Sequence, residues 1–318
     1  MFDAVALGEL LIDFACTQVN GDGYPIMDAH PGGAPANFLA TIQRFGGRTA
    51  LIGKVGTDAF GQLLRKTLSD IGICDTGIIS TDAVFTTLAF VTFNELHDRQ
   101  FSFARKPGAD TCLNKSEVAT QLIDEARVFH FGTLSLTDEP VRSATSFAVE
   151  YARSRDVLVS YDPNLRKPLW KNLEDAKEQM FWGIGMADVV KMSDEEARFM
   201  FGDVPLEEIA MAVIHDYGVK LVYITLGKDG CLFANRHGLG RAGTYDEGIV
   251  VRDTTGAGDI FGGSAMWALS RTGKSPDALT IDELRTIVRF ATISAGLSTT
   301  KAGGISSIPS LDEVEGRM

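Results

Sequence analysis

The residues best suited to chemistry lie in the segment Asp253-Thr254-Thr255-Gly256-Ala257-Gly258-Asp259. A strand-like GIVV precedes it and a helical pattern follows. Small residues at a helix start let backbone N–H groups approach an anion, and the helix dipole favours negative charge there. Asp259 would then lie beside the anion and could accept the proton of an attacking hydroxyl. This pattern favours phosphoryl transfer, although a glycine-rich helix start capped by local acids would look the same.

A second group of candidates suits the recognition of a polyol. Gly32 and Gly33, in the run PGGAPAN, would let a ligand approach the backbone. Asn37 offers a donor and an acceptor, as sugar hydroxyls require. Asp13 is a single acid in an apolar strand, so it is either paired with another group or accepts a bond from a ligand hydroxyl. Without the other motifs, the PGGAPAN run would be read as a tight turn before a helix.

Two further motifs follow predicted strands. The run DPNLR ends in Arg166, and ligands bind at the carboxyl ends of parallel strands, where an arginine can pair with a phosphate or a carboxylate. The run KMSDEE begins with Lys191, and its Ser193 and Glu196 have the spacing of a capping box. A carboxylate that orients Mg²⁺ through water is the functional alternative for Glu196.

The composition excludes several classes of protein. The formal charge is −12, from 30 basic and 42 acidic residues, which disfavours binding to nucleic acid or to an anionic membrane. The four cysteines form no CxxC pair or zinc spacing, no apolar run approaches membrane-spanning length, and the acidic N-terminus does not resemble a signal peptide. We therefore expect a cytoplasmic protein.

Two nucleotide-binding patterns are also excluded. A match to GxGxxG occurs at residues 238–243, but the TYDEGIVV that follows reads as a strand, so the strand-turn-helix context of a dinucleotide fold is missing. A dinucleotide-dependent oxidoreductase is therefore a remote alternative. The chain also lacks the GxxxxGK[ST] pattern of a P-loop.

Short apolar runs alternate with amphipathic helical patterns along most of the chain. This alternation predicts an α/β fold in which helices cover both faces of a mostly parallel sheet. Two segments, about 10–33 and 84–106, break the alternation and predict a small β-sheet lid inserted in one domain of residues 1–318. The predicted strands are 4–7, 49–55, 127–131, 157–161, 188–191 and 220–225, and the predicted helices are 35–45, 58–71, 140–154, 173–186 and 206–217.

Taken together, the motifs resemble those of the ribokinase-like (PfkB) carbohydrate kinases, and most of all the fructokinase branch. The resemblance covers essentially the whole chain, and its motifs in order are GELLIDF, PGGAPANF, GKVGTDAFG, SYDPNLRKPLW, KMSDEEARF, ITLGKDG and DTTGAGDIFGG. It implies a three-layer αβα core with a β-sheet lid, ATP as phosphoryl donor and Mg²⁺ as helper.

The resemblance also implies roles for individual residues. Asp259 matches the catalytic base, and Gly256, Ala257 and Gly258 match the anion hole. The sugar-binding positions are Asp13, Gly32, Gly33, Asn37, Phe103, Arg105 and Arg166. The nucleotide-binding positions are Lys191, Ser193, Glu196, Thr225, Gly227, Gly230 and Thr292, together with Gly256 and Gly258. Ser193 stands where the family has asparagine. A monovalent-cation site, for K⁺, would include Asp253, Thr255, Ser298, Lys301, Gly303 and Ser307.

We therefore expect a kinase that transfers the γ-phosphoryl group of ATP to the 6-hydroxyl of D-fructose and forms a homodimer through its lid. Kinases of 2-keto-3-deoxygluconate remain an alternative, because they also use arginines near these positions. Ribokinase is less favoured, because of Arg105 and the RKPLW run. A sugar-binding protein without catalysis is a remote alternative, since it would have no use for a proton acceptor beside an anion hole.

Overall fold

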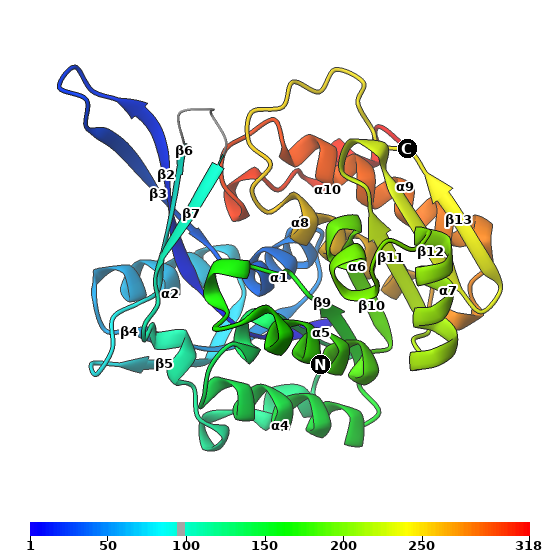
Figure 1. Cartoon of the computed structure of the whole chain (residues 1–318), viewed down its shortest axis with the longest axis horizontal. Helices are drawn as coiled ribbons and strands as arrows, with labels where there is room; N and C mark the ends of the chain where they lie inside the picture. Colours follow the sequence, from blue (N-terminus) through cyan, green and yellow to red (C-terminus); the bar gives the residue numbers. More distant parts are fainter. Residues whose placement is uncertain (94–98) are drawn as a thin grey trace.

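The alternating apolar runs form one large sheet in the computed structural model, which describes residues 1–93 and 99–318 (Figure 1). The strand order is β13-β12-β11-β10-β9-β8-β1-β4-β5. Neighbours from β5 to β11 are parallel, and β12 and β13 add two antiparallel strands at one edge. The strands are β1 (Ala4–Leu7), β4 (Thr49–Gly56), β5 (Cys74–Thr81), β8 (Val128–Gly132), β9 (Leu158–Asp162), β10 (Val189–Ser193), β11 (Leu221–Thr225), β12 (Cys231–Asn235) and β13 (Gly238–Ala242).

Helices cover both faces of this sheet, and each face has its own apolar cluster. On one face lie α1 (Ala34–Arg44), α2 (Ala59–Ile71), α8 (Ala257–Arg271) and α9 (Ile281–Ser298). On the other face lie α3 (Thr120–Asp124), α4 (Val141–Ser154), α5 (Leu173–Met186), α6 (Asp194–Phe201) and α7 (Leu206–Tyr217). The final helix, α10 (Leu311–Glu315), packs against α9. The expected three-layer αβα core is confirmed.

Short 3-10 turns connect several of these elements. They are η1 (Ala109–Cys112), η2 (Lys115–Glu117), η3 (Thr133–Leu136), η4 (Lys167–Leu169), η5 (Gly227–Asp229), η6 (Pro276–Ala278) and η7 (Ile305–Ser307). Two of them, η3 and η4, follow strands β8 and β9 at their carboxyl ends, where the loops of a parallel sheet meet.

A second, smaller sheet stands beside the core, and we call it the small sheet. Its order is β3-β2-β6-β7, and the β2–β3 hairpin projects away from the core in Figure 1. Its strands are β2 (Leu11–Val19), β3 (Pro25–Gly32), β6 (Leu88–Phe93) and β7 (Arg99–Ala104). These strands fall within the two segments predicted to form a lid, of which residues 94–98 lie outside the described part of the chain. The division into one domain over residues 1–318 stays a prediction.

The predicted strands and helices agree with the observed bounds to within one or two residues, but one predicted strand is wrong. The TYDEGIVV segment, with its GIVV, forms no strand: β13 ends at Ala242, and residues 243–256 are irregular. The side chains of Val250 and Val251 are exposed, so their β-propensity finds no neighbouring strand to pair with. The GxGxxG match itself lies largely in β13, an antiparallel edge strand, and no helix follows it directly.

Among the described residues, no helix combines the length and the apolar character that crossing a membrane requires.

Candidate active site

A cavity of about 720 Å³ lies where the carboxyl ends of the parallel strands meet the small sheet. Strands β9 and β10 end at its wall, and the small sheet contributes Asp13, Val91 and Phe103. This is the position expected for a ligand site in a parallel α/β sheet. The predicted site residues that line it are Asp13, Gly33, Asn37, Phe103, Arg166, Ser193, Glu196, Thr255, Gly256 and Asp259.

Asp259 is held in the first turn of α8 by a residue far away in the sequence. The Nδ2 group of Asn37, on α1, donates a hydrogen bond of 2.9 Å to its Oδ2 atom. Burial raises the pKa of Asp259 to about 6, and the charge of Asp162 adds to this, whereas Lys191, Asn37 and Arg166 act in the opposite direction. A carboxylate with this pKa is ionised near neutral pH and still basic enough to accept a proton.

The start of α8 has the geometry expected of an anion site. Gly256 is the N-cap residue, with a φ of 75°, and the helix begins at Ala257. The first intrahelical bond of this turn joins the N–H of Ile260 to the carbonyl of Gly256, and the N–H of Ala257 donates to Thr254 at 3.3 Å. The amides of a first helical turn have no acceptor within the helix, and apart from the Ala257 N–H, which donates to Thr254, they can face a ligand. These include the N–H of Gly258, one residue before Asp259.

Asp13 and Gly33, two of the predicted sugar-binding positions, also line the cavity. Burial raises the pKa of Asp13 to about 7, although Arg166 lowers it and Asp259 and Asp253 raise it further. A Cβ atom at Gly32 would lie 2.5 Å from Asp13 Oδ2, and one at Gly33, where φ is 114°, would lie 2.4 Å from the carbonyl oxygen of Glu9. Only glycine fits at Gly33, whereas a larger residue at Gly32 would have to displace the Asp13 carboxylate. Gly32 itself lies behind Asp13 and does not line the cavity.

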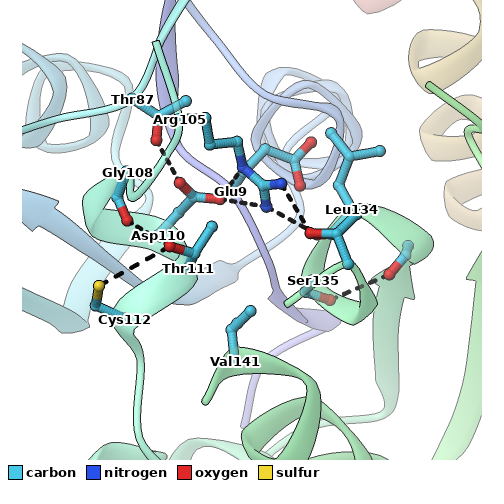
Figure 2. Close-up of polar contacts among 12 residues, drawn as sticks. Glu9, Thr87, Arg105, Gly108, Asp110, Thr111, Cys112, Leu134, Ser135 and Val141 are labelled. Carbon is cyan, nitrogen blue, oxygen red and sulfur yellow. Dashed lines mark hydrogen bonds and ion pairs between the residues drawn. The ribbon is translucent and has the colours of Figure 1, made fainter. Parts of the chain in front are cut away.

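The structure does not support the expected sugar contact of Arg105. Strand β7 ends at Ala104, and the Arg105 side chain is 1% exposed and does not line the cavity. Its guanidinium donates to Asp110 Oδ2 (2.8 Å) and to the carbonyl of Leu134 (2.8 Å), as Figure 2 shows. It also donates to Thr137 Oγ1 (2.9 Å). A buried carboxylate thus holds the guanidinium away from the cavity. We call this the Arg105–Asp110 pair.

Lys191 lies beneath the anion site and also does not line the cavity. Its Nζ atom bonds Asp162 Oδ2 at 2.9 Å and lies 2.9 Å from the place of a Cβ atom at Gly258. Burial alone would lower the pKa of Lys191, but the charges of Asp162, Glu196 and Asp259 outweigh burial and raise it. Lys191 therefore stays protonated and puts positive charge next to the start of α8.

The capping box predicted for Ser193 and Glu196 is confirmed. Ser193 Oγ accepts the N–H of Glu196 at 3.1 Å, and Glu196 Oε2 accepts the N–H of Ser193 at 2.8 Å. The other oxygen, Oε1, accepts the N–H of Leu165 at 2.7 Å. Glu196 therefore also fixes the loop after β9 that carries Arg166.

The acidic groups are arranged in a way that fits Mg²⁺ bound largely by phosphate and water. Among the described residues, no three His, Cys, Asp or Glu side chains converge to form a metal cage. Mg²⁺ usually keeps several waters and takes one or two carboxylates plus substrate phosphates. Glu196, which lines the cavity with both oxygens already accepting backbone bonds, fits a contact made through water.

Two of the positions expected for a monovalent cation, Thr255 and Gly303, bond to Asp253. Its Oδ1 atom accepts from Thr255 N (3.0 Å) and Oγ1 (2.8 Å), and its Oδ2 atom accepts from Gly303 N (2.9 Å). Asp253 therefore joins the loop after α9 to the loop before α8. The hydroxyls of Ser298 and Ser307 donate to carbonyls of their own turns, and the Lys301 side chain is exposed. Hard oxygen groups of this kind suit K⁺.

The remaining nucleotide-binding positions lie outside the cavity lining. Thr225 ends β11, Gly227 and Gly230 bound the η5 turn, and Thr292 is buried in α9, where it donates to Arg289. The cavity lining therefore includes the predicted base, Gly256 of the anion site and most of the sugar end, and it includes none of these four residues.

The motif analysis missed several lining residues, of which Glu9 is the most buried. It follows β1 by two residues and is 3% exposed. A signal was available, because an acid at a strand end within the apolar run GELLIDF has the same context as Asp162. The other lining residues that were missed include Leu11, Ala34, Val91, Leu134, Asn164, Lys167 and Phe199.

Comparisons with known proteins point in one direction. The family described as pfkB family carbohydrate kinase matches residues 1–311. Fructokinase-1 of Zea mays is 39% identical over 314 residues, which cover 98% of this chain and 95% of the relative. Fructokinase from Xylella fastidiosa, solved with bound ATP, has a TM-score of 0.88 at 28% identity and covers 99% and 98% of the two chains.

A second solved structure has the same degree of similarity. It is a double mutant of fructokinase from Vibrio cholerae O395 in its fructose-, ADP- and potassium-bound form, with a TM-score of 0.88 at 29% identity. The match covers 99% of this chain and 98% of the other. The similarity therefore extends over nearly the full length of each protein.

Proposed function

Because this chain belongs to the pfkB family of carbohydrate kinases and is an ATP-dependent sugar kinase, we propose that it phosphorylates the 6-hydroxyl of D-fructose, with Asp259 as the base. The observation that carries this proposal is the bond between Asp259 and Asn37 at the start of α8, in the same cavity as Asp13. A proton acceptor and a helix N-terminus thus line the same cavity as polar side chains that can bind sugar hydroxyls. The fructose and ADP bound to the Vibrio cholerae relative support the same choice.

In this mechanism each residue of the chain has a separate task. Asp259 accepts the proton of the 6-hydroxyl as that oxygen forms its bond to the γ-phosphorus, and the bond from phosphorus to the bridging oxygen of ADP breaks. The amides of Gly256 and Gly258 would stabilise the charge on the transferred group, and that of Ala257 would join them by leaving Thr254. Arg166 steadies the phosphate end, and Asp13 holds sugar hydroxyls.

Two ions would assist these residues. Mg²⁺, oriented by Glu196 through water, would neutralise charge on the triphosphate, and K⁺, held near Asp253, would support the start of α8. The oxygen groups already described at both places support these assignments. The small sheet would close over the cavity and exclude water, because Asp13, Val91 and Phe103 already line it.

The pairing of Arg105 with Asp110 argues against 2-keto-3-deoxygluconate as the substrate. A kinase of 2-keto-3-deoxygluconate would need positive charge for the carboxylate of its substrate. Of the two arginines expected at the sugar, Arg166 lines the cavity and Arg105 is bound to Asp110. This arrangement favours a neutral sugar over an acidic one, and fructose is such a sugar.

Replacement of the base tests the proposal. We expect Asp259→Ala to keep the native fold and sugar binding and to lose about 10²- to 10⁴-fold in kcat, the usual contribution of a general base. ADP release should be measured with fructose, ribose and 2-keto-3-deoxygluconate. Asp216→Asn, which changes an exposed carboxylate on α7, is the control and should behave as wild type.

Three outcomes would contradict parts of this proposal. Turnover near the wild-type rate in Asp259→Ala would remove the assigned base. Wild-type activity on another sugar, with none on fructose, would replace the substrate. Sugar binding without ADP release would revive the non-catalytic alternative. The same assay with Na⁺ in place of K⁺ examines the cation site.

We also propose a homodimer through the small sheet and a cytoplasmic location. The β2–β3 hairpin exposes Val19, Tyr24 and Ile26, which supports burial of that region against a second copy. All four cysteines are free, as is usual for proteins of reducing compartments.

A further inference from the structure

Glu9 makes a contact that joins β1 to the start of α1. Its Oε1 atom accepts the backbone N–H of Ala34 at 2.9 Å. Ala34 is the first residue of α1, and the N-cap residue Gly33 has no side chain to satisfy that turn. The first N–H groups of a helix need an acceptor from outside the helix. Glu9 supplies this acceptor from a different element.

The same turn of α1 carries Asn37, whose side chain contacts the proposed base Asp259. The backbone N–H of Asn37 donates to the carbonyl of Gly33 at 2.9 Å, so Ala34 and Asn37 belong to one hydrogen-bonded turn. The side chain of Asn37 then donates to Asp259 Oδ2 at 2.9 Å. A short series of contacts therefore runs from Glu9 through Ala34 and Asn37 to Asp259.

The surroundings of Glu9 keep its carboxyl group in place. Figure 2 shows it beside the Arg105–Asp110 pair, which is anchored to Leu134 of the cavity wall. Burial raises the pKa of Glu9 to about 7, while its bonds to backbone N–H groups and the charge of Arg105 lower it and the charge of Asp110 raises it. A buried carboxyl group held at this energetic cost, at the edge of the proposed active site, is a candidate for function.

We propose that Glu9 is a positioning residue for phosphoryl transfer, which acts by capping α1 and so holding Asn37 against Asp259. This inference rests on the proposed role of Asp259 as the base. Glu9 touches the N-terminus of α1, whereas Asn37 touches the base, so the effect of Glu9 reaches the reaction through Asn37. A residue that instead contacted the sugar directly would change KM before kcat.

Two substitutions at Glu9 separate capping from charge. Glu9→Leu fills the space without an acceptor, and we expect it to lower kcat about tenfold, with the KM for the sugar changed less than threefold. Glu9→Gln keeps an oxygen that can accept the N–H of Ala34, and we expect its kcat to stay within about threefold of wild type. Glu313→Ala is the matched control, since it removes the carboxylate that accepts the Ser310 N–H at the start of α10, far from the cavity.

A double-mutant cycle with Asn37→Ala tests the route of the effect. If Glu9 acts through Asn37, Glu9→Leu should lower kcat less than twofold in the Asn37→Ala background, against about tenfold alone. If the kcat of the double variant falls by the product of the two single-variant factors, the inference is overturned. So would a kcat of Glu9→Leu within twofold of wild type, or a rise in KM larger than the fall in kcat.

The Gln variant keeps the test decisive if Glu9→Leu does not fold. A folded Glu9→Gln protein with wild-type KM and a kcat within threefold of wild type supports capping, and one with a kcat tenfold lower or more overturns it. All assays use the sugar that the wild type phosphorylates fastest. Wild type without turnover on any sugar would refute the proposed function and this inference together, whereas an active wild type with an unaffected Glu9→Leu would refute the inference alone.

Discussion

At the scale of single residues, the proposed site contains carboxyl groups that would be more stable in water. Burial raises the pKa of Glu9, Asp13 and Asp259 to between about 6 and about 7. Each of these groups therefore binds protons more tightly in the folded chain than in the unfolded chain. Their ionisation near neutral pH lowers the free energy of unfolding, because a buried carboxylate is less well solvated than an exposed one.

This cost can be measured at Asp13. Its folded pKa, about 7, lies above the ordinary value of 3.8, so its contribution to stability is present below pH 4 and is lost as pH rises to 7. We expect Asp13→Asn to raise the free energy of unfolding by roughly 2 kcal/mol at pH 8 and by much less at pH 5. Urea unfolding at both pH values checks this. A larger gain at pH 5 than at pH 8 would show that the sign is wrong.

At the scale of elements, the small sheet is anchored to the core where β7 ends. Arg105 follows β7, Asp110 lies in η1, and Leu134 and Thr137 follow β8, so one guanidinium connects three segments. The Arg105 and Asp110 side chains are both almost fully buried, at 1% and 3% exposure. Asp110 also accepts from Thr87, which precedes β6. Both strands of the β6–β7 hairpin are therefore fastened at their base.

We expect Arg105→Met to lower the free energy of unfolding by about 3–5 kcal/mol, because it leaves Asp110 buried and unpaired. The double variant Arg105→Met, Asp110→Leu should lose much less, since no charge remains. Arg65→Met is the control: its pair with Asp75 is 39% and 29% exposed, and its loss should cost under about 1 kcal/mol. Urea unfolding of the four proteins provides the comparison. A cost for Arg105→Met no greater than that of the control would contradict this account.

The periodicity of the sequence predicted most of the core elements but missed others, such as β12, β13 and α9. The order of its motifs indicated which loops form the site. What it could not predict depends on tertiary context. The valines of GIVV have strand propensity but no strand partner, so the segment is irregular. Arg105 looks like a ligand contact until Asp110 is seen beside it. Glu9 lies in the motif GELLIDF, but its partner is the backbone N–H of Ala34, which only the folded chain brings to it.

At the scale of the whole molecule, three of the exposed apolar residues lie together on the projecting β2–β3 hairpin. Val19, Tyr24 and Ile26 are 64%, 68% and 44% exposed on the β2–β3 hairpin, which extends beyond the helical layers (Figure 1). An edge strand with exposed apolar side chains favours pairing with another chain.

We expect light scattering to give the mass of a dimer, about twice 34.3 kDa, at micromolar concentration. Tyr24→Asp should shift the equilibrium toward monomer, because it would bury a charge in the interface. Leu239→Asp, on an exposed position of β13 at the far edge of the large sheet, is the control and should remain dimeric. A wild-type mass of 34.3 kDa across the concentration range would contradict the proposal.

The connection from β3 to α1 is a single glycine: β3 ends at Gly32, α1 begins at Ala34, and Gly33 alone lies between them. A connection of one residue leaves little slack, so the orientation of the projecting hairpin is coupled to that of the first turn of α1. A movement of the hairpin over a bound sugar would therefore shift the first turn of α1 and with it Asn37, which donates to the Asp259 carboxylate. Closure of the small sheet and orientation of the Asp259 carboxylate would then occur together.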